Sequence, residues 1–239
     1  MSKGLFVFMA AVLMLSLSPQ ASLVSAYFDD SQVWNSEEVY NGNVEEKRFE
    51  SDALLKLHAM ELGIETEGKD MDSLAAEVHE EVVKQAAIEL GIASEGKNLQ
   101  ELEKEVHHAK VVHKAEELGL ETEGKEDKAI AKELRETMLK QKAEDLGISA
   151  EGKDIKALKK KVMETHIKSK AEKLDISTEG KDPRDIMKEI REMKVMKSAE
   201  QLGLETDNKD SEEILDEIIT NHYEEAKKQK IYPFEDGMH

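Results

Sequence analysis

The sequence contains no cysteine, which excludes disulfide bonds, thiolate nucleophiles and cysteine-ligated metal sites. Aromatic residues make up only 4% of the chain and there are only three prolines, so a core built on large rings is excluded. Charged residues, in contrast, make up 36%. This balance is typical of a water-exposed, helix-rich protein that is held together by aliphatic side chains.

Positive charge is scarce relative to negative charge. The chain has 34 Lys and Arg against 53 Asp and Glu, for a net charge of −19. Nucleic acids and anionic membrane surfaces carry the same sign, so the composition argues against both as partners. It is compatible with cationic partners, with divalent ions, or simply with solubility.

Long apolar runs are also rare, and the one present lies at the N-terminus. Lys3 precedes an apolar stretch over 4–17, and Val24 and Ala26 match the small-residue rule for a cleavage site before Tyr27. We therefore predict a signal peptide over 1–26 and a secreted or extracellular protein, with a cell-surface location also possible. The alternative is an uncleaved anchor, although the apolar run is short for a membrane span.

The rest of the chain repeats itself every 28 residues. Each copy has Ala, two variable residues, Leu, then Gly in all copies but the fifth, and finally Ile or Leu, as in Ala59 to Ile64. This pattern predicts a helix C-terminus, with glycine in the left-handed conformation and the next apolar residue folding back onto the alanine. The predicted glycine caps are Gly63, Gly91, Gly119, Gly147 and Gly203. Asp175 takes the same position in the fifth copy, where we expect the weakest junction because left-handed geometry strains most side chains.

A short polar connector and a helix start follow each cap. The connector contains a second glycine, which Asn208 replaces in the sixth copy, so this position also requires a positive φ. The predicted helix N-caps are Asp70, Asn98, Glu126, Asp154, Asp182 and Asp210. Glu101 and Glu213 stand three residues after their caps, as in a capping box, and Pro183 takes the first helical position after Asp182.

These signals predict an all-α fold. Six tandem 28-residue helix-loop repeats over 51–228 would form an elongated array or solenoid, in which each amphipathic helix packs against its neighbours. An acidic segment over 27–50 that contains aromatic residues would precede the array, and a tail over 229–239 would follow it. The period equals four heptads, but the glycine breaks reject one continuous coiled coil.

The repeat unit Ala-x-x-Leu-Gly-Ile-x-Thr-Glu-Gly-Lys, followed by apolar residues four apart, resembles the helix–extended-loop–helix class. That class includes SAP, LEM, HeH and Rho-N-like modules. The resemblance covers most of the chain after residue 26 and implies that one long helix closes one module and opens the next. It also implies nucleic acid or small proteins as partners.

Side chains that carry chemistry do not form a familiar catalytic or metal-binding pattern. The helical histidines lack the i, i+4 pairs that metal sites on helices use, and the acidic loops lack the spacing of a calcium-binding EF-hand. No nucleophile elbow, P-loop or dinucleotide fingerprint is present. We therefore predict neither an enzyme nor a bound metal or cofactor, with weak cation binding by the loops as the alternative.

The segments over 27–50 and 229–239, called the flanks here, carry all the aromatic residues after position 26 except Tyr223. Exposed aromatics are good interface anchors, so possible docking residues are Trp34, Tyr40, Tyr232 and Phe234. Alternatively, the flanks are linkers or end caps of the array.

The sequence as a whole favours a secreted, non-catalytic helical repeat protein. It would act as an interaction or structural component at the cell envelope or in an extracellular matrix, with an unknown protein or cell-envelope partner and possible self-association. The alternatives are a nucleic-acid-binding array, which follows from the resemblance alone, and a secreted enzyme inhibitor.

Overall fold

A computed structural model describes residues 51–235 of the chain, and these residues are helical with no strand. The all-α prediction is therefore confirmed. One short helix stands at the start of this region and two at its end, and five helices of 18 to 20 residues lie between them. The helices are α3 (Asp52–Glu61), α4 (Met71–Glu89), α5 (Leu99–Glu117), α6 (Asp127–Asp145), α7 (Ile155–Glu172), α8 (Pro183–Leu202), α9 (Ser211–Asn221) and α10 (Tyr223–Gln229).

The helix starts lie where the sequence predicts them. Side chains of Asp70, Asn98, Asp154, Asp182 and Asp210 each accept a hydrogen bond from a backbone N–H of the first turn. The two predicted capping boxes, at α5 and α9, are both present. Glu126 occupies the N-cap position of α6 but makes no side-chain cap bond, because glutamate is not among the short side chains that reach the first-turn amides well.

Each corner between the long helices has one hydrogen-bond pattern. The N–H of Ile64 donates to the carbonyl of Ala59 at 2.8 Å, and the N–H of Gly63 donates to Met60 at 3.1 Å, which is the Schellman pair. The same two bonds recur at 28-residue intervals down to Leu204. Asp175 also makes this pair, with φ of 58°, and Asn208 has φ of 63° in place of the second glycine.

The buried residues gather at the corners. The second half of α4 (Val83, Ala86) packs on the first half of α5 (Leu102, Val106). The second half of α6 packs on α7 in the same way, as does the second half of α7 on α8. Each of these corner cores is therefore formed by the facing ends of only two helices.

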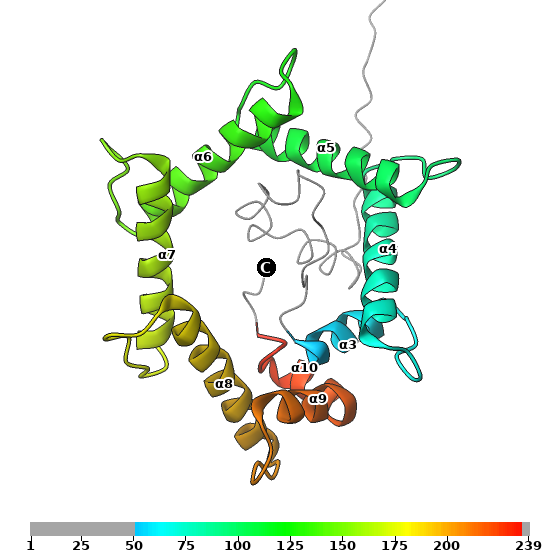
Figure 1. Ribbon diagram of the computed structural model, residues 1–239, viewed down its shortest axis with the longest axis vertical. Coiled ribbons are helices and arrows are strands. Elements are labelled where there is room, and N and C mark those ends of the chain that lie inside the picture. Colours follow the sequence, from blue (N-terminus) through cyan, green and yellow to red (C-terminus); the bar gives the residue numbers. More distant parts are fainter. Residues whose placement is uncertain (1–50, 236–239) are drawn as a thin grey trace, which may run out of the picture.

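The path of the helices differs from the predicted elongated array. Figure 1 shows that they follow a closed ring, in which α3 lies beside α9 and α10, and the two helices α3 and α9 are in contact. The sequence pattern did not reveal this closure, because it repeats the constraints of a single corner and carries no information on the packing of the two ends. The ring brings residues about 160 positions apart in the sequence into contact.

Candidate functional site

The closing seam, formed by α3 with α9 and α10, contains the largest apolar cluster among the described residues. Ala53 and Leu57 of α3 pack with Ile214, Leu215 and Ile218 of α9, and the cluster extends to α8 and to the segment after α10. Eleven buried residues belong to it, against four or five in each of the corner clusters. The seam is therefore the best-packed part of the ring.

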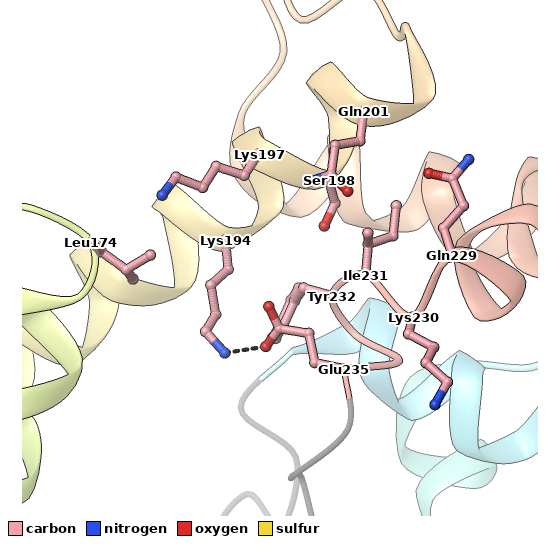
Figure 2. A pocket seen from close by; sticks show the side chains of 10 residues that line it. All are labelled: Leu174, Lys194, Lys197, Ser198, Gln201, Gln229, Lys230, Ile231, Tyr232 and Glu235. Atoms are coloured by element: carbon pink, nitrogen blue, oxygen red, sulfur yellow. Dashed lines mark hydrogen bonds and ion pairs between the residues drawn. The ribbon is translucent and has the colours of Figure 1, made fainter.

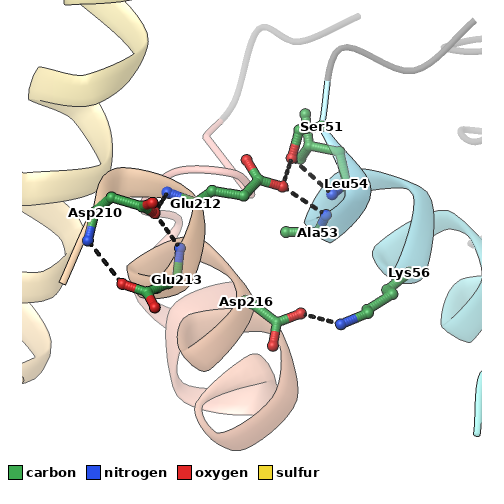
Figure 3. A network of polar contacts seen from close by, with 8 residues as sticks. All are labelled: Ser51, Ala53, Leu54, Lys56, Asp210, Glu212, Glu213 and Asp216. Carbon is green, nitrogen blue, oxygen red and sulfur yellow. Dashed lines mark hydrogen bonds and ion pairs between the residues drawn. The ribbon is translucent and has the colours of Figure 1, made fainter. Parts of the chain in front are cut away.

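Polar contacts join the first half of α3 to the first half of α9 (Figure 3). The Glu212 carboxylate accepts hydrogen bonds from the Ser51 hydroxyl at 2.7 Å and the Ala53 N–H at 2.9 Å. Lys56 Nζ lies 2.5 Å from Asp216 Oδ1. Because the contacts advance in the same direction along both helices, α3 and α9 run parallel.

The far end of the seam is held by Glu61, the last residue of α3. The Tyr223 hydroxyl donates to its carboxylate at 3.2 Å, and Lys227 Nζ lies 3.6 Å from the same oxygen. Burial is the main reason that the pKa of Tyr223 is raised. The hydrogen bond to the Tyr223 oxygen is the main reason that the pKa of Lys227 is raised. Both groups therefore keep their protons at neutral pH, and the seam ends in a hydrogen-bonded ion pair.

The segment after α10 ends in a further corner that the sequence analysis missed. The Ile231 N–H donates to Ala226 at 3.2 Å and the Lys230 N–H to Lys227 at 3.2 Å, with Lys230 at φ of 53°. This is again the Schellman pattern, but it comes 27 residues after Gly203 and has lysine where the other copies have glycine or Asp175. Ala226 and Ile231 have the same spacing as Ala59 and Ile64, and this match in the sequence could have identified the corner.

Tyr232 and Phe234, predicted as possible docking residues, belong to this core. Tyr232 is 6% exposed, and Phe234 is partly buried against the same cluster, where its ring meets Tyr223 edge-on at 5.0 Å. They are thus not free anchors for a partner, and the end-cap alternative describes them better. The other two predicted docking residues, Trp34 and Tyr40, lie outside the described residues.

A shallow cavity of about 320 Å³ lies beside the seam (Figure 2). It is lined by Leu174, Lys194, Lys197, Ser198, Gln201, Gln229, Lys230, Ile231, Tyr232 and Glu235. Lys194 is paired with Glu235 and stands 5.5 Å above the Tyr232 ring, so its charge is already used within the chain. The lining therefore forms part of the end cap.

The corner loops project from the periphery of the ring (Figure 1). Each has an exposed carboxylate directly before its second positive-φ residue, and no ion pair within residues 51–235 involves any of them. These six residues, called the loop carboxylates below, are Glu67, Glu95, Glu123, Glu151, Glu179 and Asp207. They share one position in one local hydrogen-bond pattern.

In every copy a lysine stands two residues after the loop carboxylate, but it does not form an ion pair with that carboxylate. Lys69 pairs with Glu77, eight residues ahead on the following helix, and not with the neighbouring Glu67. The same pairing joins Lys97 to Glu105, Lys125 to Glu133, Lys181 to Glu189 and Lys209 to Glu217. The lysine thus fastens each loop to its helix and leaves the loop carboxylate exposed.

The fourth copy departs from this rule. Its lysine, Lys153, donates to the backbone carbonyl of Ser149, because Lys161 occupies the position where the other copies have glutamate.

Several other ionisable groups are perturbed by burial. Burial lowers the pKa of Lys110 to about 8, whereas the charge of the nearby Glu89 acts to raise this pKa. Burial also lowers the pKa of His107, and that of His166 together with nearby lysines. His79 Nε2 lies 3.3 Å from Glu103 Oε1, and His108 Nδ1 lies 2.8 Å from Asp127 Oδ1. Within the described part of the chain, no group of three His, Asp or Glu side chains could hold a metal ion.

Among residues 51–235, no helix combines the length and apolar character that crossing a bilayer requires. No protein-family model matches the chain, and no curated protein or solved structure is significantly similar to it.

Proposed function

We propose that the chain is a secreted, non-catalytic interaction protein. Its six tandem repeats form a closed solenoid that presents the loop carboxylates to a positively charged protein or cell-envelope partner. The observation that carries the proposal is the recurrence of an exposed carboxylate, without an ion pair in the described region, at one position of every corner loop. The neighbouring lysine has a role in the fold in five of the six copies, whereas the carboxylate has none that its contacts reveal.

The affinity of such a surface would come from repetition. A single exposed ion pair contributes only about 0–1 kcal/mol. Several equal sites on one rigid frame convert later contacts into intramolecular ones, which raises the overall affinity without any new type of contact. A partner with several spaced cationic groups would gain most, and high salt would weaken its binding.

The test compares two variants of the full chain with the same change in net charge. In the first, the five glutamates among the loop carboxylates become glutamine and Asp207 becomes asparagine. In the control, six exposed acids outside the corner loops are neutralised in the same way: Asp72, Glu144, Asp145, Asp185, Glu200 and Glu224. Retention is measured on washed cell envelopes, on the secreted protein fraction and on an immobilised oligolysine surface.

We expect the loop variant to lose retention and the control to keep it. Equal loss in both variants would show that only net charge matters. Equal retention in both would show that the loop carboxylates do not bind the partner. Either result would contradict the proposal.

A further inference from the structure

Charge is distributed unevenly around the ring. α7 carries six lysines against only Glu164 and Glu172, in a chain whose net charge is −19. The lysines of α7 are Lys156, Lys159, Lys160, Lys161, Lys168 and Lys170. Lys153 before the helix and Lys173 after it extend the same basic surface, and all eight lysines are exposed. We refer to these eight residues as the basic face.

Two lysines of the basic face form ion pairs with acids of α7. Lys160 Nζ lies 3.8 Å from Glu164 and Lys168 Nζ lies 3.9 Å from Glu172, and these exposed i, i+4 pairs contribute little. Lysines at neighbouring helix positions repel one another, so this concentration of charge does not help the helix to form.

The basic face also costs the corner one of its regular contacts. Lys161 stands where the other copies have a glutamate that holds the loop lysine. A local rule kept in five copies and broken in the one basic helix indicates a role outside the fold of that corner. A partner of opposite charge would supply the missing stabilisation.

The complementary surface is present in the same chain. α4 carries five acids, Asp72, Glu77, Glu80, Glu81 and Glu89, and one lysine, Lys84. Glu77 is paired with Lys69 and Glu80 with Lys84, but these exposed pairs contribute little, and the helix keeps an excess of negative charge. The two helices lie on opposite sides of the ring, so the basic face of one molecule cannot reach its own α4 (Figure 1). It can reach the α4 of a second molecule.

We propose that the basic face of α7 docks on the acidic face of α4 in another copy of this chain. The two surfaces differ and lie on helices at opposite sides of the ring, so the contact is head-to-tail. Each added copy leaves one free surface of each kind, which produces an open chain unless the rotation between copies closes the assembly. This assembly does not use the loop carboxylates and therefore stands independently of the proposed partner binding.

Salt affects two opposing terms. Rings with a net charge of −19 repel one another at long range, and ions screen this repulsion beyond about 8–10 Å at physiological salt. The local attraction between the two helices acts at closer range but is screened as well at high salt. Association is therefore strongest at intermediate ionic strength.

Sedimentation velocity of the full chain tests the proposal with paired charge reversals. The α7 variant carries Lys156→Glu, Lys160→Glu and Lys161→Glu, and the α4 variant carries Asp72→Lys, Glu80→Lys and Glu81→Lys. The control reverses three exposed lysines on α5 and α6, namely Lys104→Glu, Lys132→Glu and Lys140→Glu. Circular dichroism shows that each variant keeps its helices.

We expect the unmodified chain and the control to associate, and each of the two other variants alone to associate at least about tenfold more weakly. An equimolar mixture of the α7 and α4 variants should recover association, because each supplies the charge that the other lost. A monomeric unmodified chain at every ionic strength, or a mixture that does not recover, would overturn the proposal. So would binding to immobilised heparin that the α7 reversal abolishes, without self-association, since it would assign the face to an external polyanion.

Discussion

The closing seam and the loop-joined corners achieve the same helix packing by different means. At a corner such as α4 to α5, the chain itself joins the two helices, and a small core with one Schellman cap is sufficient. At the seam, α3 and α9 are distant in sequence. They pack within an eleven-residue buried cluster that also includes residues of α8, α10 and the following segment, and a row of hydrogen bonds and ion pairs joins α3 to α9 and α10. The entropy cost of closing a long loop explains why the seam needs more contacts than a corner does.

The largest expected effect compares the same substitution in the two environments. Leu215 in the seam and Leu158 in the α6–α7 corner are each 1% exposed. Leu215→Ala should lower the free energy of unfolding by about 4 kcal/mol, and Leu158→Ala by about 2–3 kcal/mol, because a small open corner collapses more easily around the cavity. Urea denaturation measures both values, and a larger loss for Leu158→Ala would reverse the comparison.

Helix caps give a second, smaller contrast. The Ser51 hydroxyl caps α3 and also donates to Glu212 across the seam, whereas Asp154 caps α7 at a corner with no such long-range contact. Ser51→Ala should cost about 2 kcal/mol because both hydrogen bonds are lost, and Asp154→Ala about 1 kcal/mol. Combining Ser51→Ala with Glu212→Gln separates the two roles of the Ser51 hydroxyl, which are capping α3 and bonding Glu212 across the seam. Equal costs for Ser51→Ala and Asp154→Ala would mean that the hydroxyl stabilises only its own helix.

Lys110 in α5 provides a pH-dependent test away from the seam. Burial lowers its pKa from 10.5 to about 8, so between these values the unfolded chain binds more protons than the folded chain. This group therefore makes stability rise as pH increases through the window, and it is destabilising at neutral pH. Lys110→Met should raise the Tm at neutral pH, and the difference from the unmodified chain should shrink as pH rises from about 8 to 10.5. A difference that does not change with pH would contradict the assignment.

The smallest effect concerns the two caps that lack glycine. Asp175 at a corner and Lys230 beside the seam both adopt positive φ, which strains residues with a Cβ. Asp175→Gly and Lys230→Gly should each stabilise the fold by about 1 kcal/mol, less the entropy that glycine adds to the unfolded chain. Asn208→Gly is the matched control and should change the Tm least, because asparagine tolerates this geometry. An unchanged or lower Tm in both variants would contradict the strain argument.

The local structure of each corner was predictable because it depends on short-range chemistry. Proline after Asp182 and asparagine at position 208 marked a helix start and a positive φ from sequence alone. The pairing of Lys69 with Glu77 was not predicted, although five of the six copies have a glutamate at that position, because only the helix geometry brings residues eight apart together. The Lys230 corner was missed because its spacing is one residue short of the period.

The closure of the ring could not be predicted in the same way. It depends on contacts such as Lys56 with Asp216, which involve residues whose sequence neighbourhoods show no relation to each other. The burial of Tyr232 and Phe234 follows from that closure, since both pack on the cluster that α3 completes. Their aromatic character indicated an anchor correctly, but the surface they anchor to belongs to the same chain.

The most direct test of ring closure is zero-length carbodiimide crosslinking of the unmodified full chain at high dilution. Lys56 Nζ and Asp216 Oδ1 are 2.5 Å apart, so the reagent should join them by an amide bond. Mixing isotope-labelled and unlabelled chains distinguishes links within one molecule from links between two. A closed ring predicts abundant Lys56–Asp216 crosslinked peptides in which both halves carry the same label. Absence of this crosslink, while corner pairs such as Lys125–Glu133 crosslink efficiently, would show that the array is open.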